Sequence, residues 1–233
     1  MSAGGVPSGP PKRRLGCFAV LIALVLAPVG AVLVHAVVPP PITVLMVQRL
    51  FEGEGLHVRW RGLNDISPDL VDAVIAAEDA RFCEHDGFDF EAIEDAMEDN
   101  ARGRRVRGGS TISQQTAKNV FLWPGRSWIR KGLEAGYTVL IETVWSKRRI
   151  MEVYLNVAEM GPGVYGAEAA ARHWFGKSAS ELTRAEAARL ATILPSPREY
   201  RAADPGPYVR RRARAIQANM GEVRAQGLSD CTS

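Results

Sequence analysis

Residues 67–87 read SPDLVDAVIAAEDARFCEHDG, and this stretch predicts an apolar helix that carries a carboxylate on its buried side. Ser67 and Pro68 suit a helix start, as N-cap and first helical residue. Apolar residues then recur at helical spacing, and Glu78 falls on the same stripe. The stripe consists of Leu70, Val71, Val74, Ile75 and Phe82. This pattern favours a helix that packs against a core.

Glu78 is the most informative residue of this helix. A carboxylate on an apolar face must be paired, neutral or functional, because burying it without a partner is costly. Burial also raises the pKa of such a carboxyl towards the range of a general base. The alternative is a buried ion pair with a nearby arginine. The acids that follow are poorly spaced for a calcium loop, and His85 lacks an HExxH partner, so we expect His85 to pack at the helix end.

A second polar segment, residues 108–119, reads GGSTISQQTAKN. Its small residues and hydroxyl cap present backbone N–H groups at a helix start, and such a start suits phosphate or sugar oxygens. Amides and the Lys118 ammonium follow. The segment is not a P-loop, because the Gly-Lys-Ser/Thr ending is missing. A plain N-capped helix is the alternative.

A third group, Arg130, Lys131 and Glu134, lies on one predicted helix. Arg130 and Glu134 are four residues apart and can simply pair on the surface. The functional alternative is that the two cations hold a pyrophosphate leaving group, which needs fixed positive charge as it departs. Glu134 would then orient the cations or the sugar.

The remaining periodicity predicts a mainly α-helical chain with few and short strands. Turn residues such as Gly161-Pro162-Gly163 and Pro195-Ser196-Pro197 separate the helices. Further helices are predicted at 90–100, 113–119, 127–145, 147–156, 167–174, 184–193 and 208–221. A length of 233 residues favours one folded domain behind an apolar N-terminal segment.

Charge is unevenly distributed, although the net charge is only +3. Ten acids lie between residues 78 and 99, and eleven Lys or Arg lie between residues 101 and 150. This asymmetry suggests an anionic ligand near the basic half, with two solvated helix faces of opposite sign as the alternative. A later arginine cluster at 210–214 suits either anionic lipid head groups or, preferably, a solvated helix face.

The N-terminus predicts a membrane anchor. Residues 15–38 are almost unbroken apolar sequence, long enough to span a bilayer, and Lys12, Arg13 and Arg14 precede them. Positive charge on that flank would keep residues 1–14 in the cytoplasm and place everything after Pro39 outside. A cleaved signal peptide, with Val34-His35-Ala36 as its cleavage site, is the alternative. Residues 39–62 then read as a linker, with three prolines followed by an irregular or strand-like connector.

The three cysteines carry little information. Cys17 lies in the apolar segment, and Cys83 and Cys231 are far apart in the sequence. Their spacing matches no metal-binding or redox pattern, so we expect no disulfide framework.

Taken in order, five strings resemble the family 51 peptidoglycan glycosyltransferases, specifically the monofunctional biosynthetic type. The strings are EDARFCEHDG (78–87), GGSTISQQTAKN (108–119), RKGLEA (130–135), RIMEVYLN (149–156) continuing to Gly161 and VYG (164–166), and EAARLA (186–191) through LPSP (194–197). The resemblance covers nearly the whole domain. It implies a mainly α, lysozyme-like glycosyltransferase domain at 63–225, with a C-terminal tail at 226–233.

The resemblance also implies an activity. The substrate would be lipid II, polymerised into β-1,4-linked glycan strands as undecaprenyl pyrophosphate leaves. Glu78 would be the catalytic base and Glu134 a second essential carboxylate. Lys118, Arg130 and Lys131 would stabilise the leaving group. The residues expected to shape the cleft around the substrate are Ser110, Thr111, Gln114, Gln115 and Asn119, and Asp79 would position Glu78 or touch a divalent ion.

The implied setting follows from the same resemblance. No cofactor is required, no metal ligand set is visible, and Mg²⁺ or Mn²⁺ near Glu78 and Asp79 is the one ion considered. The partners would be lipid II, the growing glycan strand, the membrane and a cell-wall synthesis complex, with no nucleic acid. The catalytic domain would be periplasmic, on a single-pass anchor in the inner membrane. The chain contains neither Ser-x-x-Lys nor Lys-Thr-Gly, so we expect another protein to perform cross-linking.

Two other functions fit parts of the sequence. A lysozyme-like hydrolase would also use an acidic residue, but it has no pyrophosphate to hold and no need of Lys118, Arg130 and Lys131. An anchored glycan-binding scaffold would leave Glu78 structural, and it gives no reason for five such strings in order.

Overall fold

A computed structural model describes residues 23, 26–102, 109–125 and 127–233, and it confirms a mainly helical chain. The helices are α2 (Val44–Phe51), α3 (Pro68–Glu78), α4 (Phe90–Ala101), α5 (Ile112–Phe121), α6 (Trp128–Val144), α7 (Lys147–Val157), α8 (Ala167–Phe175), α9 (Arg184–Ile193) and α10 (Pro207–Ala225). Short 3-10 helices are η1 (Leu63–Asp65), η2 (Ala179–Glu181) and η3 (Asp230–Thr232). Strands β1 (His57–Val58) and β2 (Val164–Tyr165) pair in parallel.

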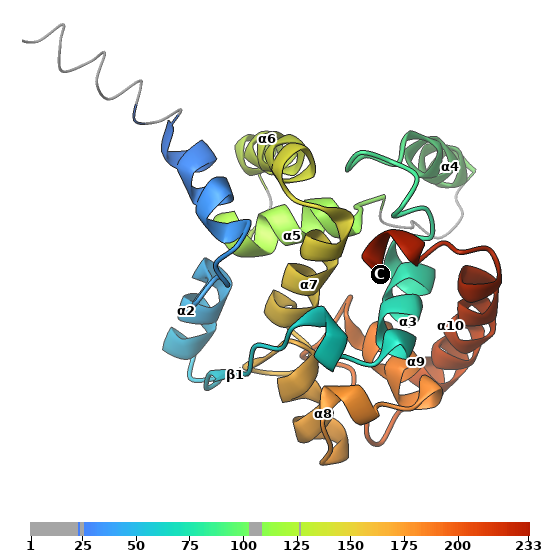
Figure 1. The fold of residues 1–233 in the computed structure, drawn as a ribbon. Helices are drawn as coiled ribbons and strands as arrows, with labels where there is room; N and C mark the ends of the chain where they lie inside the picture. The colour runs from blue at the N-terminus through green and yellow to red at the C-terminus, as the bar shows by residue number, and fades with distance from the viewer. Residues whose placement is uncertain (1–22, 24–25, 103–108, 126) are drawn as a thin grey trace, which may run out of the picture.

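Two groups of helices contribute to one apolar core. Helices α3, α9 and α10 pack on one another, and α5 packs between α6 and α7 (Figure 1). The apolar stripe of α3 is buried as predicted, with Leu70, Val74 and Ile75 inaccessible to solvent. Ser67 occupies the N-cap position, but its hydroxyl donates to the Leu182 carbonyl at 3.0 Å instead of capping the helix. The hydroxyl therefore joins α3 to the turn before α9.

The turn before α8 depends on two glycines. Gly163 has φ +66°, and a Cβ there would lie 2.1 Å from the Glu54 carbonyl oxygen. Gly166 has φ +80°, and its Cβ would lie 2.6 Å from the Asn156 carbonyl oxygen. Only glycine fits both the positive φ and the close backbone approach. These residues let β2 lie against β1.

The predicted linker contains a helix. Residues 44–51 form α2, so the expectation of an irregular or strand-like connector is wrong there and holds only around β1. The Thr43 side chain caps α2 by accepting from the Met46 N–H at 3.3 Å. Met46 is buried against the domain. The cap and the apolar contact make this segment part of the folded body.

Most of the predicted anchor lies outside the described residues, namely 15–22, 24 and 25. Residues 26–35 are helical. Within the described part of the chain, no helix combines the length and apolarity needed to cross a bilayer. The end of the segment is attached to the domain: Trp145 Nε1 donates to the Val32 carbonyl at 2.8 Å, and the Arg149 guanidinium donates to the His35 carbonyl.

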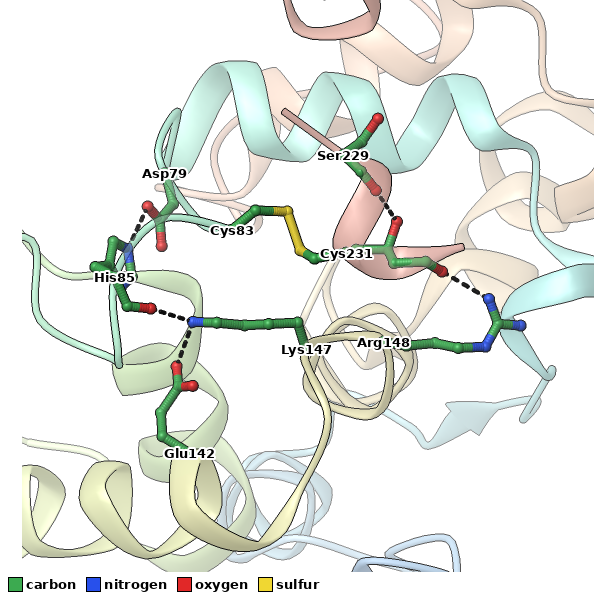
Figure 2. Close-up of a disulfide and its surroundings, with 9 residues drawn as sticks. Asp79, Cys83, His85, Glu142, Lys147, Arg148, Ser229 and Cys231 are labelled. Atoms are coloured by element: carbon green, nitrogen blue, oxygen red, sulfur yellow. Dashed lines mark hydrogen bonds and ion pairs between the residues drawn. A yellow bond between two sulfur atoms is a disulfide. The ribbon is translucent and has the colours of Figure 1, made fainter. Parts of the chain in front are cut away.

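A disulfide joins Cys83 to Cys231, which corrects the expectation from the sequence (Figure 2). The two residues are 148 positions apart, yet their Cα atoms lie 5.7 Å from each other. The chain after α10 returns to α7, where Arg148 donates to the Thr232 carbonyl at 2.6 Å. Only the three-dimensional fold brings these cysteines together. The segment 226–233 is thereby fixed beside the loop that follows Glu78.

Reducing this disulfide should destabilise the domain. A closed loop of this length restricts the unfolded chain strongly, so the Cys83→Ser/Cys231→Ser variant should lose about 2–4 kcal/mol of unfolding free energy. Urea unfolding of the wild type with and without dithiothreitol would measure the loss, and the double variant should not respond to dithiothreitol. Equal stability of oxidised and reduced wild type would contradict this account.

Candidate active site

Glu78 is the last residue of α3, and it is held by Gln115 from the string 108–119, which in turn contacts Tyr154 from the string 149–156. Its Oε2 accepts from Gln115 Nε2 at 2.8 Å, and Gln115 Oε1 accepts from the Tyr154 hydroxyl at 3.3 Å. Among the described residues, no Lys or Arg nitrogen lies within 4.0 Å of its carboxylate. The described residues therefore do not form the buried ion pair considered from the sequence. Among them, Glu78 has a neutral hydrogen-bond donor and no direct countercharge.

The electrostatics of Glu78 suit a proton acceptor. Burial raises the pKa of its carboxyl above the usual value, while the Gln115 hydrogen bond and the charges of Arg212 and Lys118 oppose that rise. A carboxylate with a raised pKa is a stronger base than one in water, and it remains ionised only above that pKa.

Asp79 connects the end of α3 to the start of α5. Its Oδ2 accepts from the Ile112 N–H at 2.9 Å, and its Oδ1 lies 2.9 Å from His85 Nε2. His85 Nδ1 accepts from the Gly87 N–H at 3.1 Å, so its ring proton is on Nε2 and is donated to Asp79. Figure 2 shows this contact beside the disulfide. Asp79 thus fixes the loop 79–87, and its role in positioning Glu78 stays a prediction.

A cation site near Asp79 was considered from the sequence. Ligand atoms of Asp79, His85 and Asp89 lie within 4.8 Å of one another. However, both Asp79 oxygens and both His85 nitrogens already make hydrogen bonds, and Asp89 pairs with Arg81. The described donors fit a hydrogen-bonded network better than a set of open metal ligands.

The predicted N-cap of the second segment is present. Thr111 Oγ1 accepts from the Gln114 N–H at 3.2 Å, and Gln114 Oε1 accepts from the Thr111 N–H at 3.1 Å, which forms a capping box. Thr111 also donates to the Gly87 carbonyl at 2.7 Å. These two residues therefore hold the loop after Glu78 against α5. A substrate contact for them stays a prediction.

The same loop is held from the far side by Lys147. Its Nζ bonds the His85 carbonyl and lies 2.8 Å from Glu142 Oε1 (Figure 2). The same Nζ stands 4.7 Å from the centre of the Phe82 ring. Glu142 in turn accepts from Ser113 of α5. Lys147 therefore ties α7 to the loop and, through Glu142, to α5.

Both cations of α6 pair with Glu134, and the Arg130–Glu134 pair is buried. Arg130 Nη1 donates to Glu134 Oε2 at 2.7 Å, and Lys131 Nζ contacts Oε1 of the same carboxylate. Arg130 is 8% exposed and Glu134 3% exposed, so the alternative of a solvated surface pair is wrong. Lys131 also lies 3.5 Å from Ser110 Oγ. Glu134 thus orients both cations at one place.

Lys118 is mostly buried, and its ammonium is close enough to Glu78 and Glu134 to be affected by both negative charges. Burial lowers the pKa of its ammonium, and the negative charges of Glu134 and Glu78 both oppose that decrease. No carboxylate oxygen of the described residues lies within 4.0 Å of Lys118. An ammonium without a direct partner can bind an incoming anion at little cost in broken contacts.

Some of these groups line a cleft of about 350 Å³. Four predicted residues line it: Gln115, Lys118, Asn119 and Arg130. The other predicted site residues do not line this cleft; they are Glu78, Asp79, Ser110, Thr111, Gln114, Lys131 and Glu134. Of these, Glu78 contacts the lining residue Gln115, and Glu134 contacts the lining residue Arg130. The cleft therefore has cations, Lys118 and Arg130, in its wall and a candidate proton acceptor, Glu78, next to it.

Sequence reasoning missed several lining residues. Leu45 and Arg49 come from α2, which was expected to be linker, and Trp123 comes from the turn after α5. Tyr154 and Glu159 come from the fourth string and its continuation. Tyr154 and Glu159 had a signal, because they stand within the fourth string and its continuation to Gly161, and so did Leu194, Pro195 and Pro197, which line the cleft from the fifth string. The residues of α2 had none.

Comparison with known proteins agrees with this geometry. The transglycosylase family model matches residues 46–221. A biosynthetic peptidoglycan transglycosylase of Caulobacter vibrioides is 60% identical over 215 residues, covering 92% of this chain and 94% of the relative. Proteins of the same name from Xanthomonas campestris (57% identity, 86% and 85% covered) and Rhodospirillum centenum (53% identity, 94% of each) are also similar. The predicted resemblance is confirmed, and the chain belongs to the transglycosylase family.

Proposed function

We propose that this protein is a peptidoglycan glycosyltransferase that polymerises lipid II into β-1,4-linked glycan strands and releases undecaprenyl pyrophosphate. The observation that carries the proposal is that a carboxylate without a direct countercharge lies next to a cleft lined by cations. Among the described residues, Glu78 has no direct countercharge and Lys118 beside it has no carboxylate partner. The names of the relatives, biosynthetic peptidoglycan transglycosylase, support the same function.

The mechanism follows from the two halves of the site. Glu78 takes the proton from the 4-hydroxyl of the acceptor sugar as that oxygen attacks the anomeric carbon of the donor. The bond from that carbon to the pyrophosphate breaks, and its electron pair leaves with the pyrophosphate. The configuration at the carbon inverts. Lys118, Arg130 and Lys131 stabilise the leaving charge, and Glu134 keeps the last two oriented.

The cations also decide between this function and glycan hydrolysis. A hydrolase cleaves a neutral glycosidic bond and develops no pyrophosphate charge, so a buried Lys without a carboxylate partner would only cost stability. Lys118 is such a lysine: it lines the cleft, is mostly buried and has no carboxylate partner among the described residues. Transfer from a pyrophosphate donor gives this ammonium a role.

The compartment and partners are part of the proposal. We place the domain on the periplasmic side of the inner membrane, with residues 15–38 as a single-pass anchor and 1–14 in the cytoplasm. The Cys83–Cys231 disulfide supports this placement, because disulfides persist mainly in oxidising compartments. Lipid II, the growing strand and the membrane are the proposed partners, and a cell-wall synthesis complex is a further one.

We propose a lysozyme-like arrangement for the domain, which the position of Glu78 at the end of a helix beside a cleft supports. No cofactor enters the mechanism, because Glu78 supplies the base and the cations supply the positive charge.

Removing the base should abolish polymerisation without unfolding the protein. Glu78→Gln should lower the rate at least about 100-fold, because the amide cannot accept the proton. Its melting temperature should stay equal or rise: the folded-state pKa of Glu78 is raised, so the ionised carboxylate costs stability at neutral pH and the amide does not.

The assay for this variant uses labelled lipid II and detergent-solubilised protein, with lysozyme digestion of the polymer as the product test. Polymer from the wild type alone supports both the function and the base. Polymer at equal rates from both proteins would remove Glu78 from its role, and none from a folded wild type would reject the function.

Lys118 should be needed for transfer. Lys118→Ala should lower the rate about 100-fold or more, because a developing pyrophosphate charge loses its partner. Lys118→Arg, which keeps the charge, should retain much more activity. A glycan hydrolase assay on purified peptidoglycan is the counter-test: cleavage that survives in Lys118→Ala would favour the hydrolase.

The rate should depend on pH with two limbs. Activity is lost as pH falls through the raised pKa of Glu78, so the acid limb should lie above 4.5. Activity is also lost as pH rises through the lowered pKa of Lys118, so the alkaline limb should lie below 10.5. Steady-state kcat across pH would show both limbs, and Lys118→Arg should remove the alkaline one. An acid limb at or below 4.5 would contradict the role of burial.

A further inference from the structure

Arg212 differs from the other arginines of its cluster. Arg210, Arg211 and Arg214 are exposed on α10, whereas Arg212 is partly buried. Its Nη2 donates to the Ala77 carbonyl, 3.4 Å away, so the guanidinium reaches the residue that precedes Glu78. Among the described acids, no carboxylate oxygen lies within 4.0 Å of Arg212. Its positive charge is therefore not compensated by a direct ion pair.

The groups that act on Glu78 come from four helices. Asp79 directly follows it at the end of α3, Gln115 and Lys118 come from α5, and Tyr154 comes from α7. Arg212 is the contribution of α10. Arg212 and Lys118 supply the positive charge, and Asp79 supplies a negative one.

Lys118 and Arg212 would have different roles once substrate is bound. Lys118 lines the cleft and would bind the departing pyrophosphate, whose negative charge offsets that of the ammonium. Phosphate charge near Lys118 would also favour the protonated form of Glu78. Arg212 is bonded to the backbone of α3 on the α10 side of Glu78 and does not line the cleft. Its charge remains available to Glu78 throughout the reaction.

We infer that Arg212 is a positioning residue for glycosyl transfer, holding the end of α3 at Ala77 and keeping the Glu78 carboxylate ionised while pyrophosphate occupies Lys118. This inference rests on the proposed function. It gives one arginine of the cluster a specific task, and it leaves its three exposed neighbours as a solvated face.

The test compares kcat across pH for the wild type, Arg212→Ala, Arg212→Lys and the matched control Arg211→Ala. Losing the cation should move the acid limb of Arg212→Ala to higher pH. The deficit relative to wild type should therefore be about threefold to tenfold larger at the acid end than on the plateau. Arg212→Lys should restore the wild-type limb, and Arg211→Ala should behave as wild type throughout.

A second readout does not need turnover. The pKa of Glu78 can be followed by ¹³C NMR of labelled glutamate carboxyls, with the signal assigned by its loss in Glu78→Gln. It should rise in Arg212→Ala and return in Arg212→Lys. A rate loss equal at every pH, or an unchanged Glu78 pKa, would overturn the inference. A folded wild type that makes no polymer would instead reject the proposed function, which separates the two failures.

Discussion

The structure depends on one constraint: a carboxylate must be kept charged while it is partly removed from water. Glu78 has a single hydrogen-bond donor, Gln115, and no ion pair among the described residues. A close cation would stabilise the charge but would also weaken the base and fill the place of the substrate hydroxyl. Positive charge is instead held at a distance, on Lys118 and Arg212. The position of each helix around Glu78 can be understood from this requirement.

Gln115 is bonded to the carboxylate of Glu78, and the other contacts hold the backbone that follows it. Asp79 and the capping box of Thr111 fix the loop after α3 to the start of α5, and Lys147 fixes it to α7. The disulfide at Cys83 adds the end of the chain to this group. The proposed base must change its protonation state during the reaction, and the neighbours that hold it need not change theirs. Such preorganisation limits the rearrangement required during reaction.

The sequence predicted the helices well because their signals are local. Apolar periodicity and turn residues placed α9 at its observed bounds, and the other predicted helices differ by a few residues at their ends. The Thr111 cap and the cations of α6 were also found from short-range pattern. Whether Arg130 and Glu134 are buried was not decided locally, because that depends on what packs over α6.

What escaped prediction depends on contacts between distant segments. Cys83 and Cys231 meet because the chain returns after α10, and no spacing rule reports that return. Arg49 of α2 reaches the cleft because its helix docks on the domain. Arg212 stood in a run of four similar arginines, and only its place near Ala77 distinguishes it. In each case the sequence gives the residue type, but it does not give the residues that surround it in the fold.

The most direct test of the central claim is the structure of the Glu78→Gln variant with lipid II bound at both sugar positions. The account predicts the acceptor 4-hydroxyl within about 3.2 Å of the side chain at position 78, and the donor pyrophosphate on Lys118 and Arg130. A folded complex with the acceptor hydroxyl on another residue, or with the pyrophosphate away from Lys118, would contradict it.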